Sequence, residues 1–152
     1  MPSDVIVFVD TNVLVYAEDL AFPTKHAMAR DWLRTLWHKR SGRISTQVMH
    51  EFYHVATRKL KPPMPPGDAR VEVRRYQKWQ PWLVDHATVE AAWGVESRFQ
   101  LSYWDALMVA AAQQQGCNLL LTEDLQHDQQ FDGLRVVNPF VLGPESVDQL
   151  KT

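Results

Sequence analysis

The sequence contains a single cysteine, Cys117, so no disulfide can form within the chain. A lone thiol is typical of proteins in a reducing compartment, and we expect a cytoplasmic location. Long apolar runs are also missing near the amino terminus, since the first one, residues 5–9, is far shorter than a signal-peptide core. No segment approaches the roughly 20 apolar residues that a membrane-spanning helix needs. Secretion and membrane insertion are therefore not expected.

A strong excess of charge is absent as well, because the formal net charge is −2 at pH 7. This excludes a broad basic surface, so any binding of nucleic acid has to use local clusters of Lys and Arg. With 45% hydrophobic and 22% charged residues, the composition is that of an ordinary globular protein, which excludes disorder. The length of 152 residues suits one domain, 1–152, with its own core.

Hydrophobic periodicity predicts strands that alternate with helices along the chain. The proline-rich stretch KPPMPPG, residues 61–67, is predicted to be a loop because its four prolines disfavour regular structure. The alternation predicts an α/β fold, a three-layer α/β/α sandwich around a mainly parallel sheet. Strands are expected at residues 6–9, 43–46 and 118–121, with 135–137 as a last edge strand. Helices are expected at residues 12–20, 68–77 and 103–115. A further helix should begin at residue 23 and stop at Gly42. Two more should begin at caps, one at Ser45 or Thr46 and one at Thr88.

The stretch VIVFVDTN ends a strand-like apolar run on a carboxylate. Asp10 lies at the carboxyl end of the expected strand, where open α/β sheets place their ligands. An aspartate at such a point also serves as a helix cap or turn residue in many proteins. Asp10 alone therefore does not identify a site.

Three further acids occupy positions that need an explanation. Asp105 lies in YWDALMVAAA, directly ahead of seven apolar residues. An unpaired carboxylate on that helix face is costly unless it caps the helix or lies in the first turn. Asp124, in NLLLTED, again follows a buried strand. Glu51 lies at the margin of an apolar stripe, where a solvated flank position is the simpler interpretation of this residue alone.

Taken together, the four acids predict a cation site. Carboxylates gathered at one edge of a sheet repel one another and raise each other's pKa, and a hard divalent cation removes this conflict. Carboxylate oxygens and water suit Mg²⁺ or Mn²⁺, whereas zinc sites usually contain His or Cys. Such an ion can activate water and neutralise charge on a phosphodiester.

Four blocks of the sequence, in this order, resemble the PIN domain: VIVFVDTNVLVYA, STQVMHEFYHVATRK, LSYWDALMVAAA, and LLLTEDL with RVVNPF. The resemblance covers residues 5–140 and is strongest to the VapC-type toxins of bacterial toxin–antitoxin pairs. It implies a PIN-like fold and an endoribonuclease that uses Mg²⁺ or Mn²⁺ to cleave RNA. It also implies a cognate antitoxin protein as partner, and a homodimer.

The resemblance further assigns roles to individual residues. Asp10 and Asp105 fall on the principal metal ligands. The fourth acid is the least regular in the family, and Glu123 and Asp128 stay open as alternatives to Asp124. The implied catalytic residues are Asp10, Glu51, Asp105 and Asp124.

Other polar residues are candidates for support or for substrate contact. Three of them resemble residues that orient the family's carboxylates, although each can equally cap a helix or satisfy a turn. Clusters of Lys and Arg beside aromatic residues supply candidates for RNA binding, and solvated helix faces with Trp in the core are the simpler alternative. The supporting candidates are Thr11, Asn12 and Thr122, and the RNA-binding candidates are Arg58, Lys59 and Arg75.

Three other functions are compatible with parts of the sequence. HEFYH, residues 50–54, matches the zinc-protease signature H-E-x-x-H, but no downstream motif marks a third ligand and the remaining acids stay unexplained. A phosphatase of the haloacid dehalogenase type needs a second Asp where this chain has Asn12. A catalytically inactive PIN domain that binds RNA or protein is the third alternative, against which the four filled acid positions argue.

Overall fold

The computed structural model describes residues 4–150, so both ends of the domain expected over 1–152 lie outside the described residues. A five-stranded sheet runs through the centre in the order β2-β1-β3-β5-β4. Strands β2, β1, β3 and β5 are parallel to one another, and β4 pairs antiparallel with β5. The strands are β1 (Val7–Val9), β2 (Gly42–Arg43), β3 (Leu119–Leu121), β4 (Gln130–Phe131) and β5 (Leu134–Val137).

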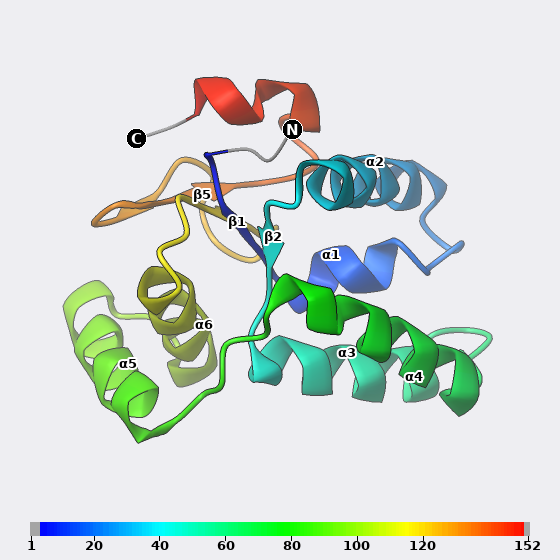
Figure 1. The fold of residues 1–152 in the computed structure, drawn as a ribbon, viewed down its shortest axis with the longest axis horizontal. Coiled ribbons are helices and arrows are strands. Elements are labelled where there is room, and N and C mark those ends of the chain that lie inside the picture. Colours follow the sequence, from blue (N-terminus) through cyan, green and yellow to red (C-terminus); the bar gives the residue numbers. More distant parts are fainter. Residues whose placement is uncertain (1–3, 151–152) are drawn as a thin grey trace.

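Helices flank the sheet on two sides (Figure 1), which confirms the expected α/β/α sandwich. Helices α5 and α6 pack against each other on one side, and α1 to α4 lie on the other. Among the helices that the structure describes, none has the length and apolar character needed to cross a bilayer. The helices are α1 (Thr11–Tyr16), α2 (Pro23–Lys39), α3 (Thr46–Arg58), α4 (Pro66–Arg75), α5 (His86–Phe99) and α6 (Tyr103–Gln114), with 3-10 helices η1 (Tyr76–Trp79) and η2 (Pro144–Gln149).

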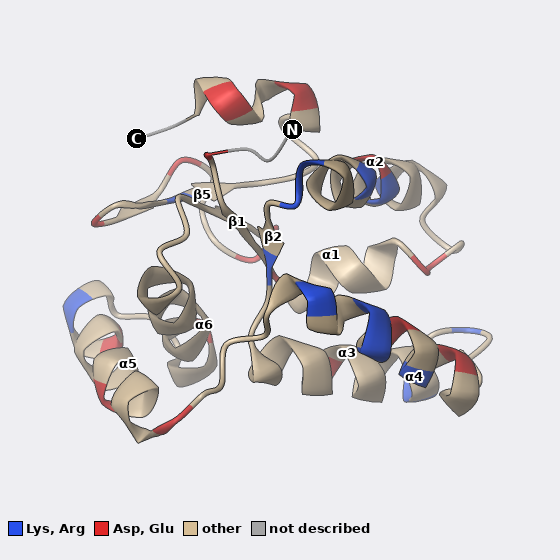
Figure 2. Ribbon diagram, viewed as in Figure 1, with Lys and Arg blue, Asp and Glu red and all other residues tan. Residues whose placement is uncertain are grey.

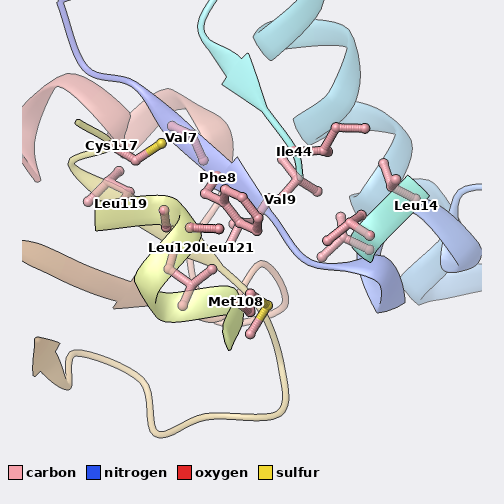
Figure 3. Close-up of a cluster of buried hydrophobic side chains, with 14 of the residues drawn as sticks. Val7, Phe8, Val9, Leu14, Ile44, Met108, Cys117, Leu119, Leu120 and Leu121 are labelled. Atoms are coloured by element: carbon pink, nitrogen blue, oxygen red, sulfur yellow. The ribbon is translucent and has the colours of Figure 1, made fainter. Parts of the chain in front are cut away.

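The core is built around two strands whose residues are all apolar. Every side chain of β1 and β3 is fully buried, as a parallel sheet covered on both faces requires. Figure 3 shows Phe8 of β1 close to the leucines of β3, with Met108 of α6 and Leu14 of α1 in the same cluster. This burial fixes the two strands rigidly beside each other.

The register of the sheet brings the ends of these strands together. Val9 of β1 pairs with Leu121 of β3, and the Asp10 N–H donates to the Leu121 carbonyl at 3.0 Å. Asp10 and Thr122, which follow the two strands, therefore leave the sheet side by side. They do so at the carboxyl edge, where parallel sheets bind their ligands.

Two helix caps differ from the predicted ones because a carboxylate supplies them. Asp10, not Asn12, caps α1, and its Oδ1 accepts the Thr11 N–H at 2.6 Å. Asp85, not Thr88, caps α5 by accepting the Thr88 N–H at 3.0 Å. Each cap satisfies an amide that has no partner within its helix.

The predicted end of the second helix is also wrong. Helix α2 ends at Lys39, and Arg40 takes the left-handed conformation with φ of 55°. Gly42 instead lies in β2, where a Cβ would meet the Trp79 indole at 2.5 Å. Close approach of the indole, rather than the end of a helix, is what requires glycine here.

The remaining differences concern short elements. Helix α1 ends at Tyr16, earlier than residue 20, and α4 begins at Pro66 inside the predicted loop because proline suits the first turn of a helix. Strand β4 was not expected. Consequently β5 is an internal strand between β3 and β4, and the prediction of an edge strand at 135–137 is wrong.

Candidate active site

Asp10 is a buried carboxylate at the carboxyl edge of the sheet, with 7% of its surface exposed. Its Oδ2 accepts a 2.7 Å hydrogen bond from Thr122 Oγ1 and a 3.3 Å hydrogen bond from Asn12 Nδ2. The Thr11 N–H donates a hydrogen bond to Oδ1 of Asp10. Three donors from two strand ends therefore hold this carboxylate in one orientation.

The surroundings of Asp10 oppose its ionisation. The pKa of Asp10 is raised to about 7, chiefly by burial and in part by the negative charges of Asp124 and Glu51. Hydrogen bonds from Thr122 and Thr11 offset only part of it. A nearby positive charge would restore the carboxylate form at neutral pH.

Helix α3 contributes the second acid. Glu51 is half-buried, and its Oε1 accepts a 2.8 Å hydrogen bond from the hydroxyl of Thr11. This contact joins α3 to the start of α1. Glu51 is therefore held in the site rather than solvated on the flank of its helix.

Helix α6 contributes the third acid from its first turn. Ser102 caps α6 by accepting the Asp105 N–H at 3.2 Å. The dipole of α6 favours a negative charge at this point, which accounts for a carboxylate ahead of an entirely apolar helix. Asp105 thus occupies a first-turn position and lines the same cavity as Asp10.

The structure separates the three candidates for the fourth acid. Asp124 is exposed and lines the cavity with the other acids. Glu123 turns away and accepts hydrogen bonds from Tyr16 Oη at 2.6 Å and from Lys25 Nζ at 2.8 Å. Asp128 pairs with Arg135 at 2.7 Å.

The four acids line one open cavity of about 780 Å³. They reach it from the ends of β1 and β3 and from helices α3 and α6. Within residues 4–150, however, no three His, Cys, Asp or Glu side chains lie close enough together to hold a metal ion. The cavity gathers the acids without arranging them as a closed ligand set.

The residues around Asp10 nevertheless have the chemistry of a hard-cation site. The carboxylates and amide that line the cavity offer oxygen donors, which Mg²⁺ and Mn²⁺ prefer. Asn12 Oδ1 is buried without a hydrogen-bond partner among the described residues, although Asn12 Nδ2 contacts both Asp10 and Thr122. An unpaired carbonyl oxygen beside a desolvated carboxylate suits a bound cation or its water.

Not all predicted substrate-binding residues lie at this cavity. Lys59 lines it at the end of α3, and so do His50 and His54 of the HEFYH motif, which are exposed on one face of α3. Arg75 lies elsewhere, with its guanidinium 4.4 Å from the centre of the Trp37 ring. In Figure 2, Lys and Arg gather on α2 and α4, whereas α5 and α6 carry few. Arg58 is exposed at the end of α3.

Two features of the site were not identified from the sequence. Trp104, one residue before Asp105, is 63% exposed and lines the cavity. The hydrogen-bonded group of Tyr16, Lys25 and Glu123 holds the segment after β3 against α1 and α2. An aromatic residue directly before a candidate ligand is a signal that was available, whereas the partners of Glu123 are too distant in sequence to be recognised.

The sequence matches the family model of the PIN domain over residues 7–130, and the chain belongs to this family. The four candidate acids Asp10, Glu51, Asp105 and Asp124 all lie within the matched segment. No curated protein matches the sequence.

Solved structures with the same fold include chains of toxin–antitoxin systems. One, from a toxin–antitoxin complex of Klebsiella pneumoniae, is 15% identical with a TM-score of 0.61 and covers 88% of this chain and 97% of its own. Mycobacterium tuberculosis VapC20, a toxin that cleaves the sarcin-ricin loop, is 20% identical with a TM-score of 0.58, covering 75% and 86%. A chain of Rickettsia felis VapBC2, solved with a promoter DNA fragment, is 12% identical with a TM-score of 0.57, covering 86% and 96%. At these identities the likeness concerns the fold.

Proposed function

We propose that this PIN domain protein is a metal-dependent endoribonuclease and the toxin of a toxin–antitoxin pair. The observation that carries the proposal is the gathering of Asp10, Glu51, Asp105 and Asp124 around one cavity. Three further acids beside the desolvated Asp10 carboxylate repel it and one another, whereas together the four suit a cation and a phosphodiester. The similar folds of VapC20 and of chains from toxin–antitoxin complexes support the toxin role.

Asp10 and Asp105 would hold the divalent cation, Mg²⁺ or Mn²⁺. When bound there, the cation supplies positive charge against the phosphodiester and makes water a better nucleophile. Its charge would also favour the ionised form of Asp10, whose pKa is raised to about 7 chiefly by burial.

The other residues of the site orient the carboxylates, accept a proton or bind water. The hydroxyl of Thr122 and the amide of Asn12 fix the Asp10 carboxylate. Thr11 holds Oε1 of Glu51, and the second carboxylate oxygen of Glu51 accepts a proton from the attacking water. Asp124, which is exposed and lines the cavity, would bind water beside the scissile phosphate.

The first test is cleavage of RNA by the purified chain with EDTA, Mg²⁺, Mn²⁺ or Zn²⁺. The proposal predicts endonucleolytic products with Mg²⁺ or Mn²⁺ and none with EDTA. Asp105→Asn should abolish cleavage, while Asp31→Asn, a matched change at an exposed aspartate of α2 that pairs with Arg34, should not. Cleavage that persists in Asp105→Asn, or in EDTA, contradicts the proposal.

The toxin role makes a separate prediction in cells. Induced expression of the chain without a partner should arrest bacterial growth, whereas Asp105→Asn should be tolerated. Coexpression with a cognate antitoxin should restore growth and yield a complex. The family resemblance also leads us to propose a homodimer, which sedimentation of the purified protein would test.

A further inference from the structure

Trp104 is an exposed aromatic residue next to the proposed active site. The residue is 63% exposed, although it directly precedes Asp105 in the first turn of α6. The indole lines the acid cavity of about 780 Å³ and also a second cavity of about 700 Å³. Single exposed apolar residues are common on protein surfaces, so it is the place of Trp104 between the two cavities that distinguishes it.

The second cavity, which we name the side groove, adjoins the acid cavity. The two share Gln47, His50 and Glu51 of α3 together with Trp104. Beyond these residues the side groove is lined on its apolar side by Leu83, Val84 and Leu107. An occupant can therefore extend from the acids, past the indole, into an apolar recess.

The indole is also held in place before any substrate arrives. The ring of Tyr103 packs against it nearly edge-on, with ring centroids 5.2 Å apart and an interplanar angle of 69°. The Gln47 side-chain amide donates a 3.3 Å hydrogen bond to the Trp104 carbonyl, which ties α3 to the start of α6. A pre-oriented aromatic face loses little conformational entropy when a flat ligand stacks on it.

We propose that Trp104 stacks on an unpaired base of the RNA substrate, next to the scissile phosphate, and that this base enters the side groove. The inference rests on the proposed ribonuclease function. A phosphate at the acids places a neighbouring base within reach of the indole, and aromatic stacking is how proteins hold unpaired bases. His50, exposed at the boundary of the two cavities, supplies a polar group for the edge of that base. The recognised substrate is consequently RNA that is single-stranded around the cleavage site.

The test compares Trp104→Ala, Trp104→Phe and wild type on one short RNA, measured as kcat/KM for cleavage with Mg²⁺. Trp93→Ala is the matched control, because Trp93 is 49% exposed on α5 and lines neither cavity. We expect Trp104→Ala to lose about 10- to 100-fold in kcat/KM and Trp104→Phe to keep most of the rate. Trp93→Ala should match wild type.

A second measurement separates stacking from a structural role. Removing the base at one position beside the cleavage site should slow wild type by a similar factor but leave Trp104→Ala nearly unaffected. The inference is overturned if removal of a base slows wild type and Trp104→Ala by the same factor at every position. It is also overturned if Trp104→Ala cleaves the intact RNA as fast as wild type. If Trp104→Ala cleaves normally but no longer binds a cognate antitoxin, the indole serves the protein partner instead. A wild-type chain that cleaves no RNA overturns the proposed function and the inference together.

Discussion

The hydroxyl of Thr122 donates a 2.7 Å hydrogen bond to Oδ2 of Asp10, although the two residues follow different strands and are 112 positions apart. The same hydroxyl accepts the Asp124 N–H at 3.0 Å. Thr122 thus links the desolvated carboxylate to the backbone of the exposed acid. The position of both acids depends on one fully buried side chain.

Thr122→Val should therefore weaken the site while keeping the volume of the side chain. Asp10 loses a donor inside the protein, which we expect to lower the free energy of unfolding by about 1–3 kcal/mol at neutral pH. Because Thr122 also orients Asp10, the affinity for Mn²⁺ should fall roughly 10- to 100-fold. Denaturant unfolding and calorimetric titration of Mn²⁺ measure the two effects.

The matched control for this change is Thr57→Val. Thr57 lies on α3, where its hydroxyl donates to the Tyr53 carbonyl at 2.7 Å, away from the acids. It should unfold and bind Mn²⁺ as wild type does. Unchanged Mn²⁺ affinity in Thr122→Val would show that this hydroxyl does not position the ligand.

The raised pKa of Asp10 predicts an unusual dependence of stability on pH. Its pKa is raised from 3.8 to about 7, so between these values the native state binds a proton that the unfolded state has released. Stability contributed by this group therefore falls as pH rises through the window. Asp10→Asn removes the titration, and relative to wild type it should gain about 4 kcal/mol between pH 4 and pH 8 without metal.

Urea unfolding of both proteins in EDTA at several pH values tests this expectation. Mg²⁺ added at pH 8 should stabilise wild type more than Asp10→Asn, because the cation binds the ionised carboxylate of the native state. Parallel pH profiles for the two proteins would contradict the raised pKa.

Glu123 and Asp124 are adjacent, yet their substitutions should act differently. Asp124→Asn should reduce RNA cleavage about 10- to 100-fold with little effect on thermal stability, since Asp124 is exposed at the cavity. Glu123→Gln should lower the thermal midpoint and keep more of the cleavage activity than Asp124→Asn. Assays of both variants in parallel decide the identity of the fourth acid, and the reverse pattern would assign it to Glu123.

The pH dependence of Glu123→Gln provides an internal check. Partial burial alone would raise the pKa of Glu123, but hydrogen bonds from Lys25 and Tyr16 outweigh it and hold this pKa below its usual value. Stability from this carboxylate is therefore present above its ordinary pKa of 4.5 and is lost as pH falls through the lower folded value. The difference in midpoint between variant and wild type should be largest near pH 7 and shrink in acid.

The sequence predicted those parts of the fold that depend on local patterns. Strands β1 and β3 are continuous apolar runs, so they and the acids that follow them could be recognised directly. Strand β4 has two residues, Gln130 and Phe131, and it exists because the turn through Asp132, with φ of 58°, returns the chain onto β5. A pattern of two residues contains no period, so this strand and the internal place of β5 could not be predicted.

The candidate site divides in the same way. Asp10, Glu51, Asp105 and Asp124 could be proposed because each lies in a local pattern that resembles the family. Partners distant in the chain decide the rest, since the separate environments of Glu123 and Asp128 depend on Tyr16, Lys25 and Arg135. The exposure of Trp104 is likewise a tertiary property, because the period of α6 does not distinguish a buried indole from one that faces a cavity.

The packing of Trp79 on Gly42 predicts a strong effect far from the acids. A Cβ at Gly42 would lie 2.5 Å from atoms of the Trp79 indole, which is itself packed against Trp37 with ring centroids 4.9 Å apart. The ring cannot move aside easily, since it is buried in the core. Gly42→Ala should therefore lower the free energy of unfolding by about 1–3 kcal/mol through overpacking.

Gly94→Ala is the matched control for this prediction. Gly94 lies inside α5, where an added Cβ meets no atom within 4 Å. Alanine is favoured over glycine in a helix interior by about 0.8–1 kcal/mol, so this variant should be more stable than wild type. Chemical denaturation of the three proteins should rank them with Gly94→Ala first and Gly42→Ala last. If Gly42→Ala unfolds at the same denaturant concentration as wild type, the contact with Trp79 is not what requires glycine in β2. The strand would then have room to shift away from the indole.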